Sequence, residues 1–239
     1  EREQSYPLRR SRGYAPFPIL LAKPGPSLLG AGAELKNTFC LSKEQYAFLS
    51  QHIGNLTNYQ TLQSYQRSIE HFEHLFRVEV EGLVCDAHPD YLSTRYARER
   101  AREQGLPLIE VQHHHAHIAA CLAEHRIVPE QPVIGLAFDG TGYGDDGRIW
   151  GGEALIADFA GYNRAGHLKY FPLPGGDQAV REPWRTALGL LHSLEREWAP
   201  DLAPVRYGSE KRLSGMDQPL LPVIENQLKT STNAPLTSS

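Results

Sequence analysis

Hydrophobic and polar positions along this chain follow the periods of helices and strands over most of its length. In residues 58–76, apolar side chains recur every three or four positions, which predicts the buried face of a helix. The compact apolar run that opens 82–89 predicts a strand, and the charged stretch at 91–105 predicts a helix that ends at Gly105. Residues 106–112 predict another strand, which leads into a cluster of histidines.

The same alternation occurs on both sides of this region. Residues 27–41 and 45–55 predict two short strands joined by a polar turn at 42–44. From residue 132 the pattern begins again. An apolar strand with a glycine-rich end is predicted within 132–146, further strands at 148–162 and 164–174, and helices at 181–196 and 220–228. We therefore expect an α/β fold with largely parallel sheets, built as two related lobes with a cleft between them.

Composition and charge narrow the classes of function. The 24 basic and 28 acidic side chains give a net charge of −4, which argues against a surface for nucleic acid. No apolar run is long enough to span a membrane, and no signal peptide opens the chain. The three cysteines, Cys40, Cys85 and Cys121, are widely spaced in apolar runs. We expect all three to be buried and unpaired, in a protein of the reducing cytoplasm.

The segment VQHHHAHIAACLAEH, residues 111–125, holds the strongest candidate site. In a helix that begins near Gln112, His113 and His117 lie one turn apart on one face, where two imidazoles can bind one divalent metal ion. His114 is expected at the edge of the site or in the core, and His115 is expected to be exposed. The alternative is a solvated helix start that carries unrelated histidines.

A second candidate lies in VIGLAFDGTGYGDD, where an apolar strand is expected to end at Asp139. Asp139 is a candidate oxygen ligand that completes a His, His, Asp metal site and takes part in catalysis. Gly140, Thr141, Gly142 and Gly144 follow, and backbone N–H groups at such glycines can approach the phosphates of a nucleotide. The alternative is an ordinary glycine-rich turn capped by Asp139.

Lys36 is a third candidate, because it follows another predicted strand in GAELKNT. As a catalytic residue it would neutralise a phosphate or a developing oxyanion. An ordinary surface lysine is the alternative.

Together these segments resemble a known family. GAELKNTFCL, CDAHPDYLSTRYA, VQHHHAHIAACLAEH, FDGTGYGDDGRIWGGEAL and PLPGGDQAVREPWRTAL are similar, in order, to the HypF carbamoyltransferases of [NiFe]-hydrogenase maturation. The resemblance covers the Kae1-like (TsaD-like) domain, whose fold is an actin- or hexokinase-like pair of lobes. It implies the end of a YrdC-like domain and a linker at 1–24, a complete first lobe at 25–127 and a partial second lobe at 128–239.

The resemblance also implies a reaction. Such proteins form carbamoyl adenylate from carbamoyl phosphate and ATP in their YrdC-like domain. The Kae1-like domain passes the carbamoyl group to the C-terminal cysteine of HypE, for synthesis of the cyanide ligands. By the family's HHxxH pattern, His113 and His117 match metal-binding histidines and Asp139 matches a metal-ligating aspartate, with either iron or zinc as the ion.

The departures from the family lead to further expectations. The acylphosphatase-like domain, the zinc fingers and most of the YrdC-like domain are absent from this sequence, so we expect the chain by itself to lack adenylation activity. Two alternatives stay open at this stage. One is the sister family that makes the threonylcarbamoyl modification of tRNA, and the other is a non-catalytic module that docks a partner.

Overall fold

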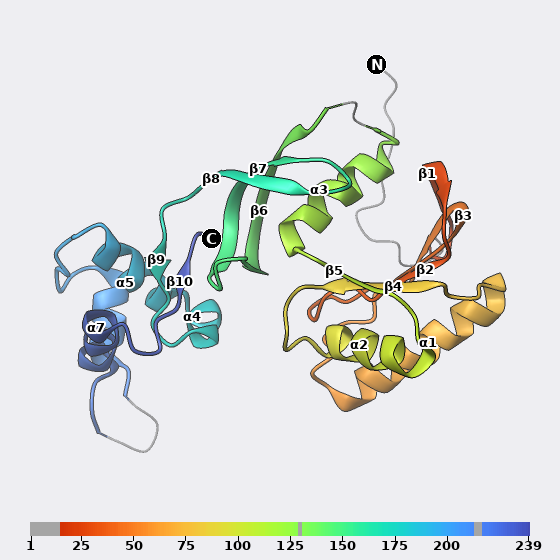
Figure 1. The fold of residues 1–239 in the computed structure, drawn as a ribbon. Coiled ribbons are helices and arrows are strands. Elements are labelled where there is room, and N and C mark those ends of the chain that lie inside the picture. Colours follow the sequence, from red (N-terminus) through yellow and green to blue (C-terminus); the bar gives the residue numbers. More distant parts are fainter. Residues whose placement is uncertain (1–14, 129–130, 213–216) are drawn as a thin grey trace. The chain divides into compact units, whose positions relative to one another are not determined.

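The computed structural model describes residues 15–128, 131–212 and 217–239, which form two compact units. The first unit comprises the described residues up to Val133 together with Ala157–Tyr162. The second comprises Ile134–Ile156 and Asn163–Ser239. Each unit contains one five-stranded sheet and several helices, so the predicted α/β class is confirmed (Figure 1). Most of the predicted YrdC-like tail, residues 1–14, lies outside the described residues.

The sheet of the first unit is mixed. Its strands are β1 (Ile19–Gly25), β2 (Leu28–Gly30), β3 (Cys40–Leu49), β4 (Gly82–Asp86) and β5 (Leu108–Val111), in the order β1-β3-β2-β4-β5. β2, β4 and β5 run parallel, whereas β3 pairs with β1 and β2 in the antiparallel sense. The expectation of a largely parallel sheet is therefore wrong for half of these pairings.

Two features of this sheet were missed by the sequence analysis. The polar turn expected at 42–44 lies inside β3, where Glu44 has a φ of 52° and the pairing with β1 shifts register. β1 itself lies in a proline-containing stretch without a clear period. Both errors have one cause, because strand pairing across the sheet tolerates a bulge and polar residues that break a local pattern.

Three helices complete the first unit: α1 (Tyr59–Phe76), α2 (Leu92–Gln104) and α3 (His113–Glu124). Asn58 caps α1 by accepting hydrogen bonds from the backbone N–H groups of Gln60 and Thr61, and Gly105 ends α2 with a φ of 66°. α1 and α2 lie on one face of the sheet (Figure 1). There they share a core with the strands, whose buried members include Leu29, Leu41, Tyr65, Ile69, Leu83 and Ala97.

The second unit has a mixed sheet and four short helices. Its strands are β6 (Val133–Tyr143), β7 (Ile149–Ala157), β8 (Tyr162–His167), β9 (Phe171–Pro172) and β10 (Leu236–Thr237), in the order β6-β7-β10-β9 with β8 against β7. Its helices are α4 (Asp177–Arg181), α5 (Pro183–Ser193), α6 (Ala203–Glu210) and α7 (Leu220–Thr230). Leu188, Val205 and Ile224 form a small core between α5, α6 and α7. The sequence predicted α5 and α7 but missed α4, α6 and β10.

β6 is longer than predicted. The strand was expected to end at Asp139, but it continues to Tyr143, so Gly140, Thr141 and Gly142 are strand residues. The tight turn begins at Gly144, which accepts from the N–H of Gly147 and donates to the carbonyl of Arg148. A side chain at Gly144 would overlap the indole of Trp150. Pairing with β7 therefore keeps the glycine-rich segment extended.

Candidate metal centre

The candidate site lies at one edge of the first sheet. Because β2, β4 and β5 are parallel neighbours, their carboxyl ends meet at this edge. The loop at 31–37 follows β2, Asp86 ends β4 opposite Val111 of β5, and α3 begins directly after β5. The fold thus brings the histidine helix beside the end of a strand that lies 27 residues earlier in the chain.

Gln112 fixes the start of α3. Its side-chain Oε1 accepts hydrogen bonds from the backbone N–H of His114 at 2.7 Å and of His115 at 3.0 Å. Gln112 is itself buried, so this cap is shielded from water. The cap sets the position of the first helical turn, which carries the histidines.

His113 and His117 face each other from successive turns of α3, as predicted. Their Nε2 atoms are 3.2 Å apart, and the ring planes are inclined by 83°. Two nitrogens that bind one tetrahedral zinc ion at about 2.0–2.1 Å are separated by about 3.3 Å. The pair therefore fits a divalent metal ion without rearrangement of either ring.

A carboxylate that the sequence reading missed supports this pair. Asp86 Oδ2 lies 2.6 Å from Nδ1 of His113, on the side of the ring opposite Nε2. The side chain of Asp86 is only 6% exposed. The available signal was its position as the last residue of an apolar strand, because strand ends line the functional edge of an α/β sheet.

The other two histidines of the cluster are structural. His114 is fully buried, which agrees with one of the two places predicted for it. His115 is also buried, so the prediction that it is exposed is wrong. Its Nε2 lies 2.7 Å from the carbonyl oxygen of Asp158 and donates to it. The turn between β7 and β8 covers this face of α3, which the helical period alone did not indicate.

Lys36 lies on the loop that follows β2, at the same sheet edge. It is exposed and has a φ of 51°. Its neighbours hold the loop in place: Asn37 donates to the carbonyls of Ala31 and Ala33, and Glu34 accepts from the N–H of Leu92 at 2.7 Å. The catalytic role of Lys36 stays a prediction.

The remaining predicted residues belong to the second unit. Asp139 lies on β6, and its Oδ1 accepts a hydrogen bond from the N–H of Gly140 at 2.6 Å. Gly140, Thr141 and Gly142 follow it on the strand, and Gly144 opens the turn. The metal-binding role of Asp139 and the nucleotide-binding role of this segment stay predictions.

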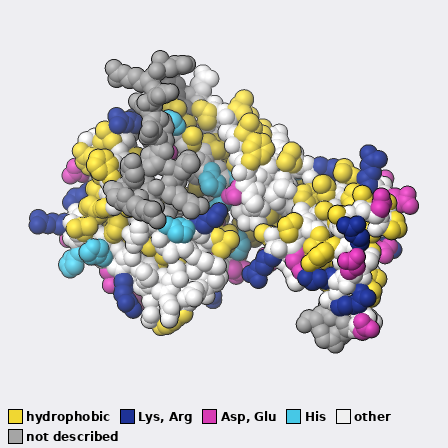
Figure 2. Space-filling model, turned by 180° about the vertical axis from the view of Figure 1, so that it is seen from behind, with side chains coloured by type: hydrophobic (Ala, Val, Ile, Leu, Met, Phe, Trp, Pro, Cys, Tyr) yellow, Lys and Arg dark blue, Asp and Glu magenta, His cyan; other side chains and the backbone are white. Residues whose placement is uncertain are grey.

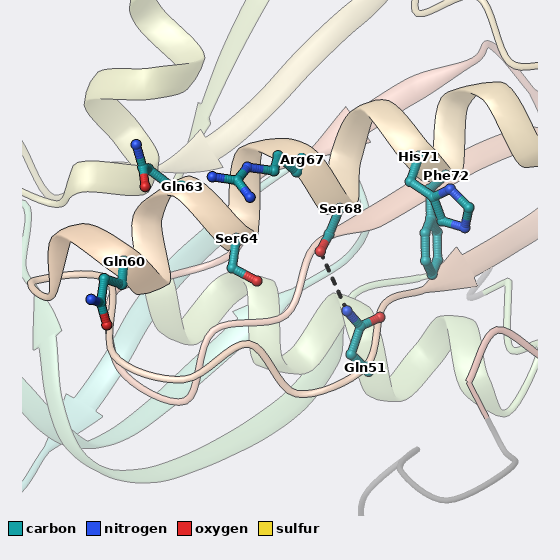
Figure 3. A pocket seen from close by; sticks show the side chains of 8 residues that line it. All are labelled: Gln51, Gln60, Gln63, Ser64, Arg67, Ser68, His71 and Phe72. Atoms are coloured by element: carbon teal, nitrogen blue, oxygen red, sulfur yellow. Dashed lines mark hydrogen bonds between the residues drawn. The ribbon is translucent and has the colours of Figure 1, made fainter.

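A separate cavity of about 440 Å³ runs along α1, lined by polar residues that include Gln60, Ser64 and Arg67 (Figure 3). Only one hydrogen bond joins its lining side chains, from Gln51 Nε2 to Ser68 Oγ at 3.4 Å. Its lining includes no predicted site residue. An open polar groove without converging charged groups is less suited to catalysis or metal binding than the histidine pair, so the pair is the better candidate.

The described residues on the face shown in Figure 2 form no basic patch that would suit a polyanion. On the face shown in Figure 2, Lys and Arg side chains lie interspersed with Asp and Glu instead of gathering in one basic patch. None of the helices in the described ranges combines the length and apolar character needed to cross a bilayer.

Comparison with known proteins identifies relatives of both units. Residues 23–124 match the family model of the HypF Kae1-like domain, and residues 135–239 match that of the carbamoyltransferase Kae1-like domain, second subdomain. Carbamoyltransferase HypF2 of Cupriavidus necator is 45% identical over 97% of this chain and 27% of its own length. The probable carbamoyltransferase HypF of Methanocaldococcus jannaschii is 35% identical over 97% of this chain and 29% of its own.

Solved structures agree with these matches. A crystal structure of full-length HypF in the phosphate- and nucleotide-bound form aligns with a TM-score of 0.81 at 44% identity, over 97% of this chain and 29% of that one. HypF of T. kodakarensis aligns with the same score at 35% identity, over 97% and 30%. The chain thus spans less than a third of the length of these relatives. It contains part of their actin/hexokinase-like fold.

Proposed function

Because this chain belongs to the HypF family of carbamoyltransferases, we propose that it is the carbamoyl-transfer module of such an enzyme, acting in [NiFe]-hydrogenase maturation. Its donor is carbamoyl adenylate, made from carbamoyl phosphate and ATP elsewhere in the full-length protein. Its acceptor is the C-terminal cysteine of a HypE-like partner in the cytoplasm. The observation that carries the proposal is the His113–His117 pair, with nitrogens 3.2 Å apart, in a chain of this family.

The transfer exchanges one bond for another. The acceptor sulfur forms a bond to the carbamoyl carbon, the bond from that carbon to the phosphate oxygen of AMP breaks, and the thiol loses its proton. The products are a thiocarbamate and AMP. A divalent ion of iron or zinc, when bound, supplies Lewis-acid polarisation of the carbamoyl or phosphate oxygens.

The chain's own residues would hold and orient these groups. His113 and His117 offer Nε2 atoms as metal ligands, and Asp139 is the proposed third ligand. Lys36 is proposed to offset negative charge at the sheet edge. The backbone N–H groups between Gly140 and Gly144 are proposed to contact the phosphate of the donor. The relative described as phosphate- and nucleotide-bound supports such a donor.

Metal analysis tests the central step. We expect the His113→Ala/His117→Ala chain to lose its bound iron or zinc, because one remaining carboxylate holds a divalent ion poorly. A matched control is His71→Ala/His74→Ala, which removes two exposed histidines from α1. Metal content per chain is measured by elemental analysis after gel filtration. Unchanged stoichiometry in the first variant would remove the histidine pair from the metal site.

A further inference from the structure

The hydrogen bond between Asp86 and His113 determines which ring nitrogen of His113 can bind a metal. An ionised carboxylate only accepts hydrogen bonds, so His113 Nδ1, 2.6 Å from Asp86 Oδ2, must carry a proton. In a neutral imidazole the other nitrogen then has the free lone pair. For His113 that nitrogen is Nε2, which is the atom that faces His117.

Asp86 is held in place by its own contacts. Its Oδ1 accepts from the backbone N–H of His88 at 2.8 Å, which leaves Oδ2 for His113. Its backbone carbonyl accepts from the hydroxyl of Thr94, and its Cα lies opposite Val111 in the β4–β5 pair. Each carboxylate oxygen therefore has a defined donor, and the side chain is buried.

We infer that Asp86 is a positioning residue that fixes His113 in the Nδ1–H tautomer, so that Nε2 is available as a metal ligand beside His117. The inference rests on the metal site of the proposed function. It concerns a residue that does not touch the metal or substrate, and carboxylate partners of this kind change metal affinity by about 10–100-fold in proteins.

The two contacts of the Asp86 carboxylate predict an unusual order of zinc affinity among variants of Asp86. In Asp86→Asn, the N–H of His88 still needs an acceptor, so the amide oxygen stays at the Oδ1 position. The amide NH₂ group then faces Nδ1 of His113 and favours the tautomer protonated at Nε2, in which Nε2 has no lone pair for a metal beside His117. Asp86→Ala removes the contact without favouring the wrong tautomer. A role in packing alone predicts the opposite order, because asparagine preserves the shape of aspartate.

Zinc affinity and the tautomer are measured on the same proteins. Zn²⁺ dissociation constants come from competition with a chromophoric chelator, and the His113 tautomer comes from long-range ¹H–¹⁵N spectra of the metal-free chain. We expect binding to weaken about 10-fold in Asp86→Ala and about 100-fold in Asp86→Asn. Glu110→Gln is the control, because Glu110 on the neighbouring strand pairs with Arg98. Its zinc affinity should stay within about twofold of that of the unmodified chain.

The outcomes separate this inference from the proposed function. If His117→Ala leaves zinc affinity unchanged, the proposed metal site is wrong. If His117→Ala abolishes binding while Asp86→Asn binds as tightly as the unmodified chain, or more tightly than Asp86→Ala, the role of Asp86 is wrong. A metal-free chain with His113 protonated at Nε2 would also overturn it, and this measurement needs no variant.

Discussion

His113, His114 and His115 occupy consecutive positions of α3 and have three different environments. His113 contacts a buried carboxylate, His114 is enclosed in the core, and His115 donates to the backbone of a distant turn. The helical period of 3.6 residues turns successive side chains by about 100°, which accounts for their separation. The contacts of His113 and His115 are made by residues of β4 and of the β7–β8 turn, respectively.

The cysteines show the same dependence on surroundings. Cys85 is buried as predicted, but Cys40 is only half-buried and Cys121 is exposed, so the expectation that all three are buried is wrong. Cys121 lies in an apolar run on α3 and is exposed, although its helix neighbours Ile118 and Leu122 are buried. No disulfide joins these cysteines within the described residues.

Thiol alkylation should distinguish Cys85 from Cys121. Burial raises the pKa of the Cys85 thiol to about 11, so only about one molecule in a thousand carries its thiolate at pH 8. We expect iodoacetamide to modify Cys121 rapidly and Cys85 only after unfolding. Peptide mass spectrometry over time at pH 8 checks this. Equal rates at the two residues in the folded chain would show that Cys85 is not enclosed as described.

At the scale of elements, a buried ion pair joins β7 to β8. Glu153 has a fully buried side chain, and Arg164 Nε donates to its Oε2 at 2.6 Å. Ser238, next to β10, donates to the other oxygen. Burial by itself would raise the pKa of Glu153, but the hydrogen bonds from Arg164 and Ser238 and the charge of Arg164 outweigh it. The pKa therefore lies below its ordinary value.

Replacing this carboxylate should destabilise the chain. We expect Glu153→Gln to lower the free energy of unfolding by about 3 kcal/mol at pH 7, because the Arg164 guanidinium loses its buried charged partner. Denaturant titration followed by circular dichroism measures the change. Glu225→Gln is the control, because Glu225 forms an exposed pair with Lys229, and its loss should cost about 0.5 kcal/mol or less. Equal losses of unfolding free energy in Glu153→Gln and Glu225→Gln would contradict a special stabilising role of the buried Glu153–Arg164 pair.

The loss of unfolding free energy in Glu153→Gln should depend on pH and be smaller in acid. Because the pKa of Glu153 is lower in the folded chain, its contribution to stability is complete above its ordinary value of 4.5. That contribution is lost as the pH falls from 4.5 through the folded-state pKa. The difference in unfolding free energy between the unmodified chain and Glu153→Gln should therefore shrink with acidification over this window.

At the scale of the whole molecule, this chain corresponds to less than a third of the length of the HypF relatives named above. Carbamoyltransferase HypF2 of Cupriavidus necator and the full-length HypF structure are more than three times as long as this chain, and the proposed reaction needs a donor formed outside the two units. Substitutions in this chain should therefore affect the proposed carbamoyl transfer without affecting the formation of carbamoyl adenylate.

In the full-length protein, Asp139→Ala should abolish transfer to the partner cysteine and leave carbamoyl adenylate formation intact. Asp139 is the proposed third metal ligand, whereas adenylation is proposed to occur in the YrdC-like domain. Labelled carbamoyl phosphate is followed separately into adenylate and into the partner's thiocarbamate, with Asp145→Asn as a control in the same segment. Retention of both products would exclude Asp139 from the mechanism, and loss of both would indicate a folding defect.

The sequence by itself determined the features that depend on neighbouring residues. The period of three and four residues located α1, and a charged stretch closed by Gly105 located α2. Helix geometry alone placed His113 and His117 on one face of the helix that follows Gln112. The resemblance of ordered motifs indicated the family. These features could be predicted because each depends on residues within a few turns of the chain.

Only the tertiary structure decided the contacts between distant segments. Parallel pairing of β4 with β5 brings Asp86 to His113, and pairing with β7 keeps β6 extended past Asp139. The β7–β8 turn buries His115. Such contacts depend on which strands become neighbours and on what covers each helix face, and no local period carries that information. The contact of the Asp86 carboxylate with His113 is therefore visible only in the folded chain.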